Sequence, residues 1–384
     1  MKSVVLSGKA IVFGKNALEY LRQTEYKRTF VVTGGSSMMK YGVIDKVKEY
    51  VGGEGKSVQV YAGIGKNPTI REVLAGLAAM NEFKPDLVLA VGGGSAMDAA
   101  KAMLLFYEFP QFNFDNILDH IRDNTVPTER KTGLICVPST SGTGTEVTKG
   151  AVITDPEREL KVPIMTPCLR PDVALMDPAL PMTMPAKIAA ETGMDALTHA
   201  IEAYINHNLD DYDAALCEGA IKGVMKWLPV SCTQATEESR EKVHNFQCMA
   251  GIAFANVGLG MVPGIAHSWG GIYNLAHGLT NAVVLPFALE YNRRDPAVAA
   301  KLAELSHLCR CKDIVKAIAD MKEALGVPHS FSDAGISQAQ YKKEFALLLD
   351  HAMLGATNVN PVKMDRESMT KMLDAVYYGK EIDF

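Results

Sequence analysis

The sequence predicts two domains of different fold class, an α/β domain over residues 1–181 and an all-helical domain over residues 182–384. Short apolar runs alternate with glycine turns and amphipathic segments in the first half, whereas long helical patterns fill the second half. A proline-rich stretch at 178–185 separates the two patterns. Because 384 residues suffice for two cores, we expect a cleft between the domains that holds the functional site.

The first domain repeats the order strand, turn, helix. Such βαβ units form a mainly parallel sheet with helices on both faces. The predicted strands lie at 29–35, 57–63, 86–92, 134–140, 150–154 and 173–177, and the predicted helices at 41–51, 69–80 and 96–106. In the second domain, apolar residues at helical spacing predict helices at 187–205, 213–228, 243–257 and 296–308.

Composition favours a small-molecule partner. The formal net charge of -5, with 22% charged residues, provides no basic surface for nucleic acid. Seven scattered cysteines without CxxC pairing indicate reduced thiols and a cytoplasmic protein. We expect neither a signal peptide nor a membrane-spanning segment, because no apolar run is long enough.

A glycine-rich turn follows the predicted strand 86–92. Gly92, Gly93, Gly94 and Ser95 lead directly into a helix, whose first backbone amides would face a pyrophosphate. A simple turn with a helix cap is the alternative, since the GxGxxG pattern of Rossmann folds is absent. A second loop favours the nucleotide, because it gathers many hydroxyl groups around Gly142 and Gly144. They belong to Ser139, Thr140, Ser141, Thr143, Thr145 and Thr148.

The end of the strand 29–35 bears on the choice of nucleotide. An acidic residue at this place binds the ribose 2′-hydroxyl of NAD, but this chain has Gly34 there. A 2′-phosphate would fit beside Gly35, Ser36 and Ser37, with Lys40 adding positive charge. This predicts NADP rather than NAD, although a plain βα turn with discrimination elsewhere stays open.

Donors for a divalent metal lie in the second domain. Asp195 and His199 are four residues apart in a predicted helix, which places both side chains on one face. His267 and His277 follow in a stretch of Gly, Ala and aromatic residues with few charges. Four oxygen and imidazole donors in one region indicate a metal site.

Five motifs resemble the iron-dependent (group III) alcohol dehydrogenases: NPTI at 67–70, GGGSAMDAAK at 92–101, PSTSGTGTEVT at 138–148, GMDALTHAIEAY at 193–204 and AHSWGGIYNLAHG at 266–278. The resemblance implies a Rossmann-like nucleotide domain, a helical domain, a site in the cleft between them, and a homodimer. It also implies oxidoreduction between small alcohols and aldehydes or ketones. With Gly34 at this position, the chain resembles the NADPH-preferring aldehyde reductases of the family, which also have a glycine in place of the strand-end aspartate.

The resemblance assigns roles to single residues. Asp195, His199 and His277 match three of the four metal ligands of the family, whereas Pro263 stands where the fourth, a histidine, is expected. His267 matches a histidine that relays protons beside the metal. Further nucleotide-binding residues are expected at Asn67, Asp98 and Lys161, of which Asn67 and Asp98 have a turn and a helix cap as alternatives.

Pro263 leaves three outcomes open. Iron or zinc stays on the three remaining ligands with water in the gap, which we favour; His267 replaces the missing ligand; or the metal is lost. In the last case the protein would be a metal-free or impaired nucleotide-binding relative.

Two further pairs of interpretations stay open. Trp269 and Tyr273 either wall a substrate pocket or pack its base. Lys101 either serves the nucleotide site or is a solvated helix residue.

Overall fold

The computed structural model describes residues 3–384. The chain divides into two compact units, Val5–Met184 and Pro185–Phe384. Residues 3 and 4 belong to the second of these units. The domain boundary predicted near Pro181 lies close to this division.

The first unit is built on a six-stranded parallel sheet with the strand order β1-β8-β5-β4-β2-β3. The strands are β1 (Ala10–Phe13), β2 (Arg28–Gly34), β3 (Ser57–Ile64), β4 (Leu87–Gly92), β5 (Gly133–Pro138) and β8 (Val173–Met176). All residues of β4 and β5 are buried, as expected for central strands covered on both faces. The predicted parallel α/β domain is confirmed.

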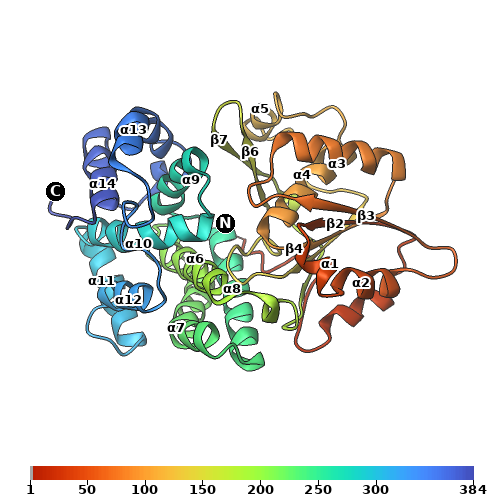
Figure 1. Cartoon of the computed structure of the whole chain (residues 1–384), viewed down its shortest axis with the longest axis horizontal. Helices are drawn as coiled ribbons and strands as arrows, with labels where there is room; N and C mark the ends of the chain where they lie inside the picture. Colours follow the sequence, from red (N-terminus) through yellow and green to blue (C-terminus); the bar gives the residue numbers. More distant parts are fainter. Residues whose placement is uncertain (1–2) are drawn as a thin grey trace. The chain divides into compact units, whose positions relative to one another are not determined.

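Helices cover both faces of this sheet (Figure 1). Alternate residues of a strand point to opposite faces, so Phe30 and Val32 pack with α3 (Ile70–Phe83) and α4 (Gly94–Glu108). Val31 packs on the other face. There the cover consists of η1 (Ala17–Gln23), α1 (Ser37–Lys40) and α2 (Val43–Val51).

The predicted strand 150–154 is confirmed as a strand, β6 (Gly150–Asp155), but it lies outside the parallel sheet. It forms an antiparallel hairpin with β7 (Leu160–Met165). Neither β7 nor β1 was expected from the sequence. β7 contains Pro163, which removes a backbone donor and hides the strand pattern, and β1 is only four residues long.

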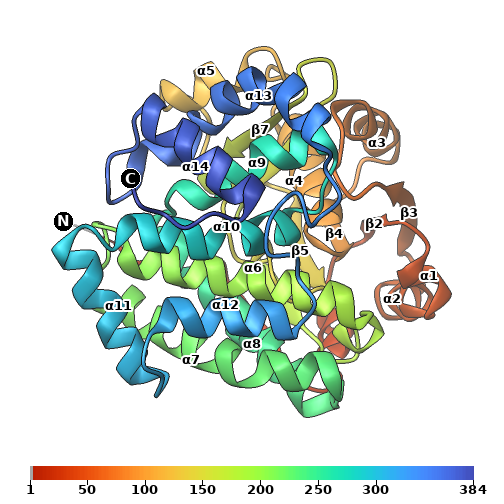
Figure 2. The same ribbon diagram turned by 60° about the vertical axis from the view of Figure 1, so that its left-hand side comes forward.

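The second unit is helical, and the predicted all-α class is confirmed. Its helices are α6 (Ala186–Ile205), α7 (Asp211–Thr233), α8 (Glu237–Val257), α9 (Met261–Tyr273), α10 (His277–Asn292), α11 (Pro296–Leu308), α12 (Ile314–Ala324), α13 (Gln338–Ala352) and α14 (Arg366–Tyr378). Figure 2 shows α6 among α7, α8 and α10. The helix α6 is buried on nearly every side from Ala189 onward, because its small residues admit close neighbours. A Cβ on Gly193, for example, would meet Leu228 of α7 at 2.2 Å.

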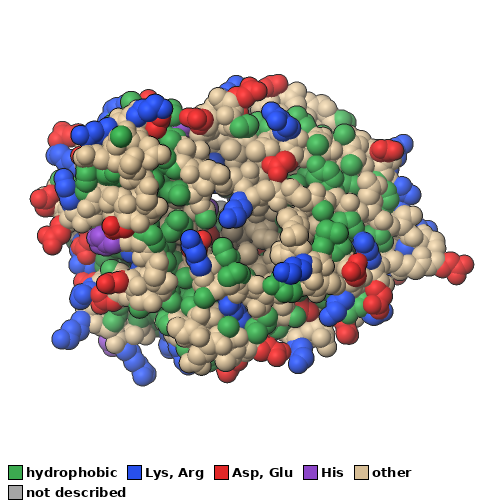
Figure 3. All heavy atoms as spheres, in the orientation of Figure 1, with side chains coloured by type: hydrophobic (Ala, Val, Ile, Leu, Met, Phe, Trp, Pro, Cys, Tyr) green, Lys and Arg blue, Asp and Glu red, His purple; other side chains and the backbone are tan. Residues whose placement is uncertain are grey.

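Charged side chains of both signs are interspersed over the face shown in Figure 3. Within residues 3–384, no single helix combines the length and apolarity that a membrane crossing requires. The helices α8 and α9 meet that requirement only as a pair, and the chain bends by 107° between them.

Candidate nucleotide and metal sites

The glycine turn after β4 and the hydroxyl-rich loop lie against each other in the first unit. Gly92 has φ +153°, and α4 begins at Gly94. A Cβ on Gly94 would lie 2.7 Å from Cγ2 of Thr143. The backbone N–H of Ser139 donates to the carbonyl oxygen of Gly92 at 2.8 Å. Two loops that are far apart in the sequence therefore form one surface around the first turn of α4.

Lys101 anchors the hydroxyl-rich loop. Its ammonium group donates to the carbonyl oxygens of Thr145 (2.7 Å), Thr148 (2.8 Å) and Gly150 (2.9 Å). The side chain is fully buried, which makes the solvated interpretation wrong. Burial lowers the pKa of Lys101 to about 8.

Asp98 and Lys161 lie near Lys101. The backbone N–H of Val152 donates to Oδ2 of Asp98 at 3.1 Å. Burial raises the pKa of Asp98 to about 6, against the opposing effect of the two lysines. Lys161 donates to Oδ1 of Asn67 at 3.0 Å. Asp98, Lys161 and Asn67 are partly buried, and a carboxylate whose pKa is raised beside two lysines is a feature found at ligand sites as well as in structural ion pairs.

The hydroxyl of Ser95 donates to the carbonyl oxygen of Lys66. A hydrogen bond from Ser95 to a phosphate therefore requires an exchange of partner. Among the other predicted hydroxyl residues, Thr148 lies within reach of the Lys101 ammonium (3.4 Å), and Thr140 lies where a Cβ added to Gly93 would meet its side chain at 3.4 Å.

The end of β2 is open. Gly34 is partly exposed, while Gly35, Ser36, Ser37 and Lys40 are exposed. A Cβ on Gly34 would meet only the carbonyl oxygen of Ile64, at 3.5 Å. The backbone there has room for a ligand group, and the two residues that follow Gly35 carry hydroxyls.

The second unit brings Asp195, His199 and His277 together, the first two from α6 and the third from the start of α10. Their donor atoms all lie within 4.8 Å of one another. Oδ1 of Asp195 is 3.6 Å from Nε2 of His199 and 3.8 Å from Nε2 of His277. Asp195 and His199 are buried and His277 is partly exposed. A carboxylate and two imidazoles at these distances fit one divalent ion.

Asn281 lies beside this group and was not expected from the sequence. Its amide nitrogen lies 2.6 Å from Oδ1 of Asp195 and 3.0 Å from Nε2 of His277. The spacing HGLTN, in which Asn281 follows His277 by four positions, would have indicated it, because i and i+4 share one helix face.

His267 and Pro263 both lie on α9. The ring of His267 is centred 4.9 Å from that of His277, but His267 lies outside the group of ligand atoms found among the described residues. Pro263 is buried in the first turn of α9, where a missing N–H costs no hydrogen bond within the helix.

The aromatic residues after His267 form part of the core. Trp269 is fully buried and stacks on Phe331 at 3.9 Å between ring centres, with Tyr341 on a nearly parallel plane. Tyr273 packs against Trp269 at 5.4 Å. Trp269 therefore packs in the core of the helical unit and does not wall an open pocket.

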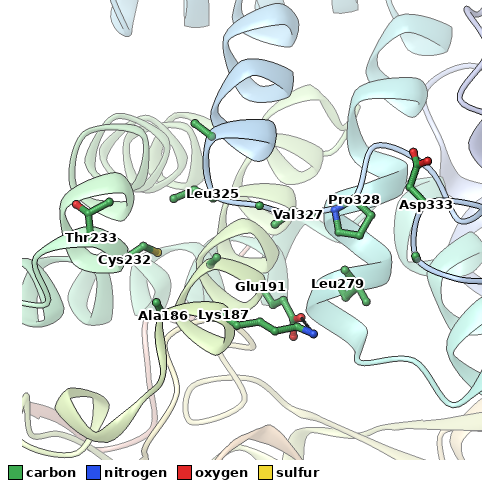
Figure 4. Close-up of a pocket in the computed structure, with 14 residues that line it drawn as sticks. Ala186, Lys187, Glu191, Cys232, Thr233, Leu279, Leu325, Val327, Pro328 and Asp333 are labelled. Carbon is green, nitrogen blue, oxygen red and sulfur yellow. Dashed lines mark ion pairs between the residues drawn. The ribbon is translucent and has the colours of Figure 1, made fainter.

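A pocket of about 580 Å³ lies in the helical unit (Figure 4). Glu191, one turn before Asp195, and Leu279, two residues after His277, both line it. Lys187 and Glu191 form an ion pair there at 3.9 Å. None of the predicted site residues is among the lining residues of this pocket.

Known proteins match the chain over almost its whole length. Residues 8–178 match the family described as iron-containing alcohol dehydrogenase, and residues 189–377 match the C-terminal part of the same family. An NADPH-dependent butanol dehydrogenase of Clostridium saccharobutylicum is 37% identical over 97% of this chain and 98% of its own length. A 1-propanol dehydrogenase of Citrobacter freundii is 33% identical over 97% and 99%.

The fold has a solved counterpart in an iron-containing alcohol dehydrogenase of Thermococcus thioreducens. The TM-score is 0.90 at 32% identity, covering 99% of this chain and all of the other. Fold, site and relatives together define an oxidoreductase that uses a nucleotide cofactor and a metal. The chain belongs to the iron-containing alcohol dehydrogenase family, which confirms the resemblance and the predicted alcohol dehydrogenase activity.

Proposed function

We propose that this chain is an NADP(H)-dependent, metal-assisted alcohol dehydrogenase that works mainly as an aldehyde reductase on small substrates. The observation that carries the proposal is the group of Asp195, His199 and His277, whose donor atoms lie within 4.8 Å of one another. Two of the three side chains are buried, and a buried carboxylate beside two imidazoles is costly unless it is paired or binds a cation.

The preference for NADP(H) is supported by the open end of β2. No carboxylate stands at Gly34 to repel a 2′-phosphate, and the exposed Ser36, Ser37 and Lys40 offer two hydroxyls and a positive charge. A relative named an NADPH-dependent butanol dehydrogenase agrees with this preference. The names of the relatives, butanol and propanol dehydrogenases, favour short primary alcohols and their aldehydes as substrates.

The residues divide the chemistry among them. The ion bound by Asp195, His199 and His277, iron or zinc, would supply Lewis-acid polarisation of the carbonyl oxygen. His267, whose ring lies beside that of His277, would donate the proton to the reduced substrate, directly or through water. The first turn of α4, together with Thr143 and Ser139, would hold the pyrophosphate.

The test uses protein purified without oxygen and without added metal. We expect elemental mass spectrometry to find about one iron or zinc per chain. Butanal reduction should be faster with NADPH than with NADH, should stop after chelation and should return when the ion is restored. Metal-free protein that reduces butanal as fast would replace this proposal by a metal-independent reductase.

Pro263 motivates the second candidate, a nucleotide-binding relative without turnover. Such a protein would change the fluorescence of NADPH on binding without consuming it. Consumption of NADPH with butanal therefore separates the two candidates.

A further inference from the structure

We propose that the side-chain oxygen of Asn281 is the fourth protein ligand of the metal ion. This inference rests on the proposed metal site, and it concerns how that site is completed although Pro263 has no donor atom. Asn281 lies on α10 one turn after His277, so both side chains project from the same face of the helix.

The position of the Asn281 amide is that of a ligand. The amide nitrogen, Nδ2, lies 2.6 Å from Oδ1 of Asp195 and 3.0 Å from Nε2 of His277. Ligand atoms bonded to one ion at about 2.1 Å are separated from each other by about 3.0 to 3.4 Å. The amide thus occupies a place close to that of a neighbouring ligand, beside two of the three donors.

The carboxylate of Asp195 sets the orientation of the Asn281 amide. Its nitrogen faces the carboxylate of Asp195, whereas its oxygen is buried without a hydrogen-bond partner. A half-turn about the last side-chain bond exchanges the two atoms. A cation among Asp195, His199 and His277 would favour that half-turn, because the amide oxygen has lone pairs for a metal and the amide nitrogen has none available.

Burial restricts the alternatives. Asn281 is fully buried, so bulk water does not reach it to satisfy its oxygen. The neighbouring polar residue Thr280 turns its hydroxyl back to the carbonyl oxygen of His277 at 2.8 Å and so does not face the group. With Asn281 the site has two oxygen and two imidazole donors, a set that first-row divalent ions accept.

The decisive experiment is a crystal structure of the metal-loaded full chain with the ion located by anomalous scattering. We expect the oxygen of Asn281 within about 2.0 to 2.3 Å of the ion. The inference would be overturned if the ion were bound by Asp195, His199 and His277 while the Asn281 amide nitrogen still donated its hydrogen bond to Asp195. That result would leave the proposed function intact. Protein that binds no iron, zinc or cobalt would overturn both.

Variants test the same point in solution by competition with a chelator for Co²⁺. Asn281→Leu should lose about 10- to 100-fold in affinity and change the visible spectrum of bound Co²⁺. Asn281→Asp, which keeps an oxygen donor, should bind within a few-fold of the parent. Thr280→Val is the matched control and should leave affinity and spectrum unchanged.

Two outcomes in solution would contradict the inference. In the first, Asn281→Leu keeps the Co²⁺ affinity and the spectrum of the parent. In the second, Asn281→Asp loses as much Co²⁺ affinity as Asn281→Leu, which would mean that the amide N–H is the group that matters. Binding of NADPH and the far-ultraviolet circular dichroism of each variant show whether it has folded. The crystal structure decides the question if Asn281→Leu does not fold.

Discussion

The carboxylate of Glu202 accepts a hydrogen bond from the backbone N–H of Val262 at 2.9 Å and a second from Gly260 at 3.1 Å. Glu202 follows His199 by three residues on α6, and Val262 precedes Pro263 on α9. The helix that carries two metal-site residues thus fixes the start of the helix that carries His267. Burial raises the pKa of Glu202 to about 7, from an ordinary value of 4.5.

This relationship predicts a pH dependence of stability. Between pH 4.5 and about 7 the folded state holds a proton on Glu202 that the unfolded state has released, so the contribution of Glu202 falls as the pH rises. Glu202→Gln does not titrate. We expect the melting temperature of this variant, relative to the parent, to increase from pH 4.5 to above pH 7. A constant difference in calorimetry across this range would show that Glu202 does not titrate there.

Gly34→Asp should reverse the choice of nucleotide. A carboxylate at the end of β2 would accept hydrogen bonds from the ribose hydroxyls of NADH and repel a 2′-phosphate. We expect the ratio of kcat/KM for NADPH to that for NADH to fall by at least about tenfold, which corresponds to about 1.4 kcal/mol. Gly34→Asn is the uncharged control and should change the ratio much less. An equal effect of both variants would mean that size, not charge, decides.

Gly94→Ala should weaken the nucleotide site through Thr143. The added Cβ would lie 2.7 Å from Cγ2 of Thr143, so the turn and the hydroxyl-rich loop would have to separate. We expect a loss of about 1–3 kcal/mol in unfolding free energy and weaker binding of NADPH in fluorescence titration. Gly93→Ala, whose Cβ would lie at an ordinary 3.4 Å from Thr140, is the matched control for stability. Adding Thr143→Ser, which removes the closest atom, should restore part of the loss.

Lys101→Met should loosen the hydroxyl-rich loop. The change leaves three backbone carbonyls without their donor, each of which costs on the order of 1–3 kcal/mol when buried. Amide hydrogen exchange over residues 139–150 should become faster, and NADPH should bind more weakly. The exposed Lys84, beyond the end of α3, provides a control as Lys84→Met. Unchanged exchange in the loop of Lys101→Met would contradict the anchoring role.

Much of the fold could be predicted from local pattern. The strands β2, β3, β4 and β5 carry enough consecutive apolar residues to be recognised without knowledge of their partners. The strand β7 could not, because Lys161 and Pro163 interrupt its pattern and only its pairing with β6 makes it a strand. Likewise α9 is rich in glycine and begins with Pro263 in its first turn, so its helical state depends on packing in the core of the second unit.

The sequence by itself determined the α/β and all-helical classes, the glycine turn, the absence of a carboxylate at Gly34, and the pairing of Asp195 with His199. These follow from composition and from the helical repeat of 3.6 residues, which act over a few residues. The family resemblance implied that His277 belongs with that pair, and only the tertiary structure decided that Asn281 lies beside them, that Lys101 is buried and that Trp269 lies in the core. Those contacts join segments far apart in the chain, and burial depends on what packs against a side chain rather than on its neighbours in sequence.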